Sequence, residues 1–271
     1  MSQLWNLLLF YPLVNALIWA YTFTGNLGLS IILLTIILRV AMTPLILPSL
    51  RMSKKMQELA PELAKLKEEF KDNKQALMTA QADLYKKNGA NPASGCLPQI
   101  LQIVVLIALF NALNLVLHTP ADSLVTKLKP ILYSTVRIQE NFRLSTGFWY
   151  LNLAKPDLIR IPGLPVPLPG LFLLLAGFTQ FLTSKMMMPE VKAEKKIAAS
   201  TSGSTDDAMA GMQQQMMYMF PLMTIIFGYQ FPSGLVLYWL VFSLVSLVQQ
   251  YLATGCGGLT PWLKRLNLLK S

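Results

Sequence analysis

Five long apolar runs alternate with polar segments along the chain, and each run is long enough to cross a bilayer. A transmembrane helix needs about 20 mostly apolar residues to cross roughly 30 Å of hydrocarbon. The pattern predicts an all-α polytopic membrane protein with a five-transmembrane-helix core. The predicted spans are residues 28–47, 97–117, 168–188, 212–231 and 234–253.

The N-terminal segment, residues 1–27, contains a further apolar stretch that is less regular. Asn6, Pro12 and Asn15 interrupt it, and it carries no lysine or arginine. Its many tryptophan, tyrosine and phenylalanine residues suit the boundary between lipid and water. We expect an interfacial helix on the outer surface, with a sixth span over residues 4–23 as the alternative.

Residues 51–90 form a polar segment with a regular apolar stripe. Apolar residues recur there at alternating spacings of three and four, and "KDNK" at 71–74 supplies turn residues. The pattern predicts a helical hairpin whose apolar seam faces inward. Its charges either dock partners and incoming chains or form only a solvated face. The seam consists of Met52, Met56, Leu59, Leu63, Leu66 and Phe70 in the first helix, and Leu77, Ala80 and Leu84 in the second.

The distribution of positive charge predicts the orientation. The chain is 54% hydrophobic and 13% charged, with a net charge of +10 and a mean hydropathy of +0.47. Nine Lys and Arg residues fall within 51–90, and none within 1–27. Because positive loops stay in the cytoplasm, the hairpin is expected inside and the N-terminus outside. The same rule makes 118–167 an outer loop, 189–211 a flexible cytoplasmic loop and 254–271 a short cytoplasmic tail.

Arg39 is the most unusual residue of the pattern, because it lies at the middle of the first span. It is about 16 Å from the outer end of that helix, at about 1.5 Å per residue. No Asp or Glu occurs in any of the five spans to neutralise it. Thr35 lies one turn earlier on the same helix face. Amides on other spans include Gln102, Asn111, Gln180, Gln214 and Gln249, which are the candidate groove residues.

A charge at this depth has two possible explanations. Carbonyl and amide groups satisfy a buried structural arginine, or a water-filled cavity reaches the midplane and Arg39 meets acidic groups that enter it. The second interpretation makes Arg39 the centre of a hydrophilic groove.

Several motifs resemble the YidC/Oxa1/Alb3 family of membrane protein insertases. They are "GLSIILLTIILR" at 28–39, "YKKNGANPASGCLPQILQ" at 85–102, "MQQQMMYMFPLM" at 212–223 and "FPSGLVLYW" at 231–239. The resemblance implies five core spans around a groove that opens to cytosol and lipid. It assigns Arg39 as the groove arginine, Thr35 as its neighbouring hydroxyl, and Gln180 and Trp239 as substrate contacts.

The expected function is that of an insertase and chaperone of the bacterial plasma membrane. Nascent membrane proteins and lipid are the expected partners, with the ribosome and the Sec translocon as further candidates, and no DNA partner is expected. The tail carries only Lys264, Arg265 and Lys270 for ribosome docking. The chain shows no nucleophile–base pair, Walker loop or metal cluster, so no cofactor, metal or enzymatic activity is expected. The alternative function is a small-molecule transporter or channel with a polar midplane site.

Overall fold

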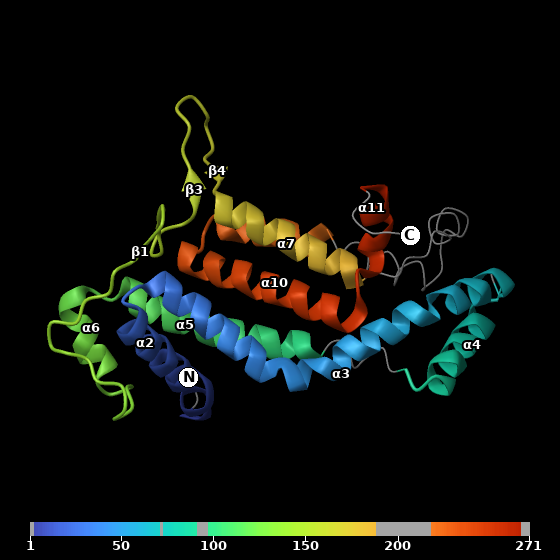
Figure 1. Ribbon diagram of the computed structural model, residues 1–271, viewed down its shortest axis with the longest axis horizontal. Coiled ribbons are helices and arrows are strands. Elements are labelled where there is room, and N and C mark those ends of the chain that lie inside the picture. Colours follow the sequence, from blue (N-terminus) through green and yellow to red (C-terminus); the bar gives the residue numbers. More distant parts are fainter. Residues whose placement is uncertain (1–2, 71–72, 91–96, 188–217, 267–271) are drawn as a thin grey trace. The chain divides into compact units, whose positions relative to one another are not determined.

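The computed structural model describes residues 3–70, 73–90, 97–187 and 218–266, and these residues are mostly helical (Figure 1). Four strands of two residues each lie within residues 147–169 and form two small antiparallel pairs. The elements are α1 (Gln3–Trp5), η1 (Asn6–Phe10), α2 (Tyr11–Thr24), α3 (Leu27–Glu69), α4 (Lys74–Lys87), α5 (Leu97–His118), α6 (Ala121–Leu128), β1 (Gly147–Phe148), β2 (Leu151–Asn152), β3 (Leu158–Ile159), β4 (Leu168–Pro169), α7 (Leu171–Met187), α10 (Ser233–Thr254), η3 (Gly257–Leu259) and α11 (Thr260–Arg265).

Four helical segments in the described part of the chain are long and apolar enough to cross a membrane. Two shorter apolar helices accompany them, Leu171–Met187 and Tyr218–Gly228. The predicted class, an all-α polytopic membrane protein, is therefore confirmed. The four long segments are Gln3–Thr24, Leu27–Glu69, Ile100–His118 and Ser233–Thr254.

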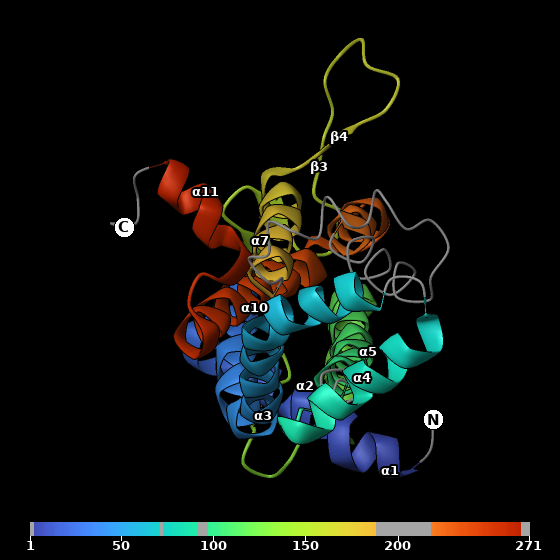
Figure 2. The ribbon, with the colours of Figure 1, turned by 90° about the vertical axis from the view of Figure 1, so that its right-hand side faces the viewer.

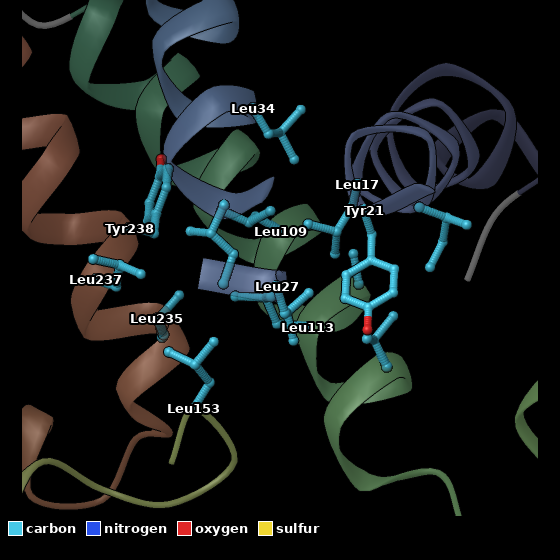
Figure 3. Close-up of a cluster of buried hydrophobic side chains, with 14 of the residues drawn as sticks. Leu17, Tyr21, Leu27, Leu34, Leu109, Leu113, Leu153, Leu235, Leu237 and Tyr238 are labelled. Carbon is cyan, nitrogen blue, oxygen red and sulfur yellow. The ribbon is translucent and has the colours of Figure 1, made fainter. Parts of the chain in front are cut away.

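The chain divides into two compact units, and the first comprises Met1–Met42, Gln99–Thr179 and Leu222–Val245. Leucines from α2, α3, α5 and α10 meet in its core, together with Leu153, which follows β2 (Figure 3). Leu17, Leu27 and Leu153 are fully buried. Helix α2 presents one face to this core and leaves Trp19 and Phe23 exposed on the other. The N-terminal helix is thus an integral part of the first unit.

The loop predicted to lie outside, residues 118–167, is attached to α2 by polar contacts along the helix. The buried Asn15 side chain donates to the Ile131 carbonyl (2.9 Å) and accepts from the Tyr133 amide (2.6 Å). Further along α2, the Tyr21 hydroxyl accepts from the Ser145 amide (2.9 Å). These contacts satisfy backbone groups of an irregular segment that has few partners of its own. Asn15, which interrupts the apolar pattern of the sequence, therefore holds the loop.

A second set of polar contacts fixes the start of α7. The Asp157 carboxylate, 2% exposed, accepts from the Leu173 amide (2.9 Å) and from the Tyr150 hydroxyl (3.0 Å). Burial raises the pKa of Tyr150, so its hydroxyl stays protonated and remains a donor. A side chain on Gly170 would overlap the Asp157 carboxylate. This cap explains why α7 begins at Leu171, three residues after the start expected from hydropathy.

The second unit comprises Thr43–Pro98, Gln180–Pro221 and Ser246–Ser271. The first span and the first hairpin helix are expected as separate elements, but α3 runs through both without a break. Pro44, Pro48 and Pro61 lie inside α3 and do not end it. Helix α4 folds back beside the end of α3 (Figure 2).

The apolar seam of the hairpin faces inward, as its spacing predicts. Leu59 and Leu77 are buried, whereas Lys54, Glu58 and Glu62 are exposed. Asn73 caps the start of α4 by accepting from the Ala76 amide (3.0 Å). The nine predicted seam residues are thus all buried or half-buried in the structure.

Candidate functional site

Arg39 is buried within the first unit and rests on an aromatic ring. Its side chain is 7% exposed, and its guanidinium carbon lies 4.1 Å from the centroid of the Phe242 ring. Arg39 comes from α3 and Phe242 from α10. The ring face carries a negative partial charge, so this stacking stabilises a desolvated guanidinium by about 2 kcal/mol. Arg39 thus makes a cation–π contact inside an apolar helix bundle.

Tyr238 and Gln102 extend this site toward α5. Tyr238 lies one turn before Phe242 on α10, on the same helix face as the ring that stacks against Arg39. The Gln102 amide nitrogen donates to the Tyr238 hydroxyl at 2.8 Å. The Gln102 carbonyl oxygen is buried and has no hydrogen-bond partner among the described residues. A buried unsatisfied acceptor is costly, so this oxygen marks a position where a water molecule or a ligand donor would be favourable.

Thr35 lies one turn from Arg39, as expected, and is 1% exposed. Its hydroxyl donates to the Ile31 carbonyl of its own helix (2.6 Å). Threonines inside helices often satisfy their hydroxyl hydrogen in this way. The remaining lone pairs of the Thr35 oxygen can still accept a hydrogen bond.

The other expected site residues lie in several places. Trp239 packs against Phe231, with ring centroids 5.7 Å apart. Asn111 is half-buried on α5, and its separation from Gln102 equals two and a half helical turns, which puts it on the opposite face. Gln180 and Gln249 belong to the second unit. Gln249 donates there to the Thr43 hydroxyl (2.8 Å). Gln214 lies outside the described residues.

Phe242 and Tyr238 are the two members of the site that sequence reasoning missed. The resemblance predicts Trp239, whereas the aromatics on the side of α10 that meets Arg39 are Tyr238 and Phe242, which lie four residues apart. A spacing of four places two residues on one helix face. The spacing of Tyr238 and Phe242 could therefore indicate an aromatic face of α10, although other aromatic pairs in the chain show the same spacing.

The residues around Arg39 favour binding rather than bond-making chemistry. They comprise one cation, one phenol, one amide and one threonine hydroxyl, which together suit an acidic or polar group brought in by a ligand. No group of His, Cys, Asp and Glu side chains in the described ranges is arranged to hold a metal ion. Fold and site together define a polytopic membrane protein with a buried cationic site.

Comparison with known proteins gives this class a family. The model of the 60Kd inner membrane protein family matches residues 19–256, and the chain belongs to that family. It is 34% identical, over 93% of its length, to the membrane protein insertase YidC of Fusobacterium nucleatum, of which the match covers 97%. Another relative is the membrane protein insertase YidC 2 of Bacillus anthracis, 31% identical with 82% of that protein covered.

Some relatives are much longer than this chain. The membrane protein insertase YidC of Syntrophobacter fumaroxidans is 32% identical over 91% of this chain, but the match covers only 38% of that protein. The chain therefore spans about two fifths of the length of such relatives. Its family and its apolar helices together make it a multi-pass protein of the bacterial inner membrane.

Proposed function

We propose that this protein inserts hydrophobic segments of nascent membrane proteins into the bilayer and assists their folding there. The observation that carries the proposal is that Arg39 is buried and stacks on the Phe242 ring. The relatives of the chain are named as insertases. The substrates are nascent membrane proteins, and the product environment is the surrounding lipid. The alternative of a small-molecule transporter finds no support among these relatives. An insertase belongs to no known class of enzyme.

In the proposed mechanism, Arg39 receives the polar or acidic flank of an arriving segment. Moving such a flank across hydrocarbon is expensive, because each charge loses its hydration. A groove with water and a fixed positive charge shortens the apolar barrier. The hydrophobic part of the segment then moves into lipid, at about 25 cal/mol for each Å² of apolar surface removed from water.

Further groove residues follow from the same proposal. Thr35 and Gln102 belong to the same unit as Arg39 and offer hydrogen-bonding groups close to the midplane. Trp239 is proposed as a contact to the apolar part of the substrate. Asn111, Gln180, Gln214 and Gln249 stay groove residues that are predicted from the sequence and the resemblance alone.

We also propose that the N-terminal helix lies on the outer membrane surface and does not cross it. Asn15, which binds the outer loop, is about 14 Å from the end of α2, at about 1.5 Å per residue. A spanning α2 would draw this loop into the hydrocarbon, together with its exposed neighbours Arg137 and Glu140. Irregular backbone does not occur where it would face lipid. An interfacial α2 leaves both the loop and its charges in contact with water.

The proposed orientation places the N-terminus outside and the tail inside, with the hairpin of α3 and α4 in the cytosol. There the hairpin is available to incoming chains, to the ribosome and to the Sec translocon. Single cysteines in the hairpin should react only with reagents on the cytosolic side, and those in 118–167 only from outside. Reaction of a cysteine at Leu4 from the cytosol would instead establish a sixth span.

Reconstitution tests the function directly. The purified protein is placed alone in liposomes, and a short single-span substrate is added from outside and assayed for protease protection. Insertion above that of empty liposomes is expected. Solute flux through the same liposomes, without insertion, would favour the transporter alternative and contradict the proposal.

A further inference from the structure

The outer loop carries a rigid hairpin whose exposed side chains are almost all apolar. Strands β3 and β4 pair Leu158 with Pro169 and Ile159 with Leu168. Between them, the Leu164 amide donates to the Ile161 carbonyl (3.2 Å), and Gly163 has a φ of +93°. Proline followed by glycine with positive φ is typical of a type II turn. The exposed apolar residues of the hairpin are Ile159, Ile161, Leu164, Val166 and Leu168.

The composition of the hairpin suits a low-dielectric surrounding. Residues 158–169 contain four prolines, which lack an amide N–H and so leave fewer donors to satisfy. The Pro167 carbonyl accepts from the Tyr229 hydroxyl (3.0 Å). Arg160 is the only charged residue of the hairpin, and it is positive. Exposure of these apolar side chains to water is unfavourable in free energy.

The position of the hairpin favours contact between its apolar side chains and lipid. It ends directly before α7, whose 17 residues extend about 26 Å, at about 1.5 Å per residue. That length is slightly less than the hydrocarbon thickness of about 30 Å, so the hairpin begins at the hydrocarbon boundary. In both views it projects sideways from the start of α7 (Figures 1 and 2). A sideways hairpin at this level lies along the membrane surface.

Two features next to the hairpin in the chain are also apolar and exposed. Exposed residues of α7 form one stripe at helical spacing, namely Leu171, Leu174, Leu175 and Phe178. Trp149 is 77% exposed, stacks edge-on against Phe172 (5.9 Å between centroids) and has a left-handed backbone with φ of 52°. Tryptophan is enriched where lipid meets water. A strained backbone that holds this ring outward is consistent with a role for it at the interface.

We propose that the hairpin 158–169 and Trp149 form an anchor in the outer leaflet of the bilayer. The apolar tip, Ile161, Leu164 and Val166, inserts at the boundary between headgroups and acyl chains, and Arg160 binds a phospholipid phosphate. The anchor depends on the proposed assignment of α7 as a membrane span, but not on the insertase mechanism. It holds the outer end of α7 at a fixed depth.

Fluorescence quenching in vesicles tests the anchor. Cys96 and Cys256 are replaced by serine, Leu164→Cys is labelled with an environment-sensitive fluorophore, and the full chain is reconstituted in phosphatidylethanolamine and phosphatidylglycerol vesicles. We expect a blue shift of its emission, quenching by lipids with a nitroxide near the headgroup, and weak quenching by aqueous iodide. Ser134→Cys, an exposed polar site of the same outer loop, is the matched control and should show the reverse.

A second substitution separates insertion from local structure. Ile161→Asp in the labelled Leu164→Cys protein should shift quenching from lipid nitroxide toward iodide, whereas Arg137→Asp should leave it unchanged. Iodide access at Leu164 equal to that at Ser134 would overturn the anchor. Protection from both quenchers would also overturn it, because a protein partner or a second copy would then cover the tip.

A label at Phe178→Cys distinguishes this failure from failure of the span. Lipid quenching at Phe178 with iodide access at Leu164 would reject the anchor alone. Iodide access at both sites would reject α7 as a membrane span.

Discussion

Replacing Arg39 by alanine removes a buried charge, which should leave the stability of the protein unchanged or raise it but impair its function. The stacking of Arg39 on Phe242 at 4.1 Å contributes about 2 kcal/mol. Placing an arginine at the bilayer centre costs about 2.5–3.5 kcal/mol. The stacking energy that alanine loses is therefore smaller than the cost of the buried charge that it removes. We expect Arg39→Ala to be as stable as the wild type or more stable, by about 0.5–1.5 kcal/mol.

The same substitution should impair insertion in a way that depends on substrate charge. A hydrogen bond to a charged group contributes about 1.5–3 kcal/mol, so segments with an acidic translocated flank should insert about tenfold to a hundredfold more slowly. Matched neutral segments should insert almost normally. Arg39→Lys keeps the charge but loses the planar guanidinium, and it should retain much of the activity toward acidic segments.

The assay compares melting temperature and insertion for wild type, Arg39→Lys and Arg39→Ala in the same liposomes. Arg51→Ala, at an exposed arginine of the same helix, is the matched control and should change neither quantity. A lower melting temperature for Arg39→Ala, with equal loss for acidic and neutral segments, would show a structural arginine and refute the reasoning. Full activity toward all segments would show that the charge is not required.

Three further variants, two single and one double, test the supporting structure. Gly170→Ala should lower the melting temperature, because the new methyl group overlaps the Asp157 carboxylate and costs the cap about 0.5–2 kcal/mol; an unchanged value would contradict this role. Tyr238→Phe removes the acceptor of the Gln102 amide and should destabilise the protein by about 1–3 kcal/mol, measured by thermal unfolding. Leu63→Asp with Leu66→Asp should open the hairpin and weaken insertion while the spans still assemble, since each half-buried leucine contributes part of the about 1.5–3 kcal/mol that full burial gives. Faster hydrogen exchange confined to residues 51–90 would show this, and undiminished insertion would make the hairpin dispensable.

Local sequence patterns predicted the helices well, because hydropathy and helical spacing depend on near neighbours. The runs at 97–117 and 234–253 agree within one residue with α5 (Leu97–His118) and α10 (Ser233–Thr254). The seam of the hairpin followed from spacing alone. Local patterns failed at those helix ends that contacts with distant residues decide. Hydropathy continues across the start of α7, whereas the distant Asp157 decides that the helix begins at Leu171.

The sequence by itself determined that this is a membrane protein with a positive charge at the middle of its first span. Composition and span length are sums over the chain and need no contacts. Only the tertiary structure decided that Phe242 of α10 is a ring that stacks against Arg39. The rotation of α10 about its own axis makes this choice, and one residue of helix turns a side chain by about 100°. Packing against α3 and α5 sets that rotation, and a single sequence contains no record of it.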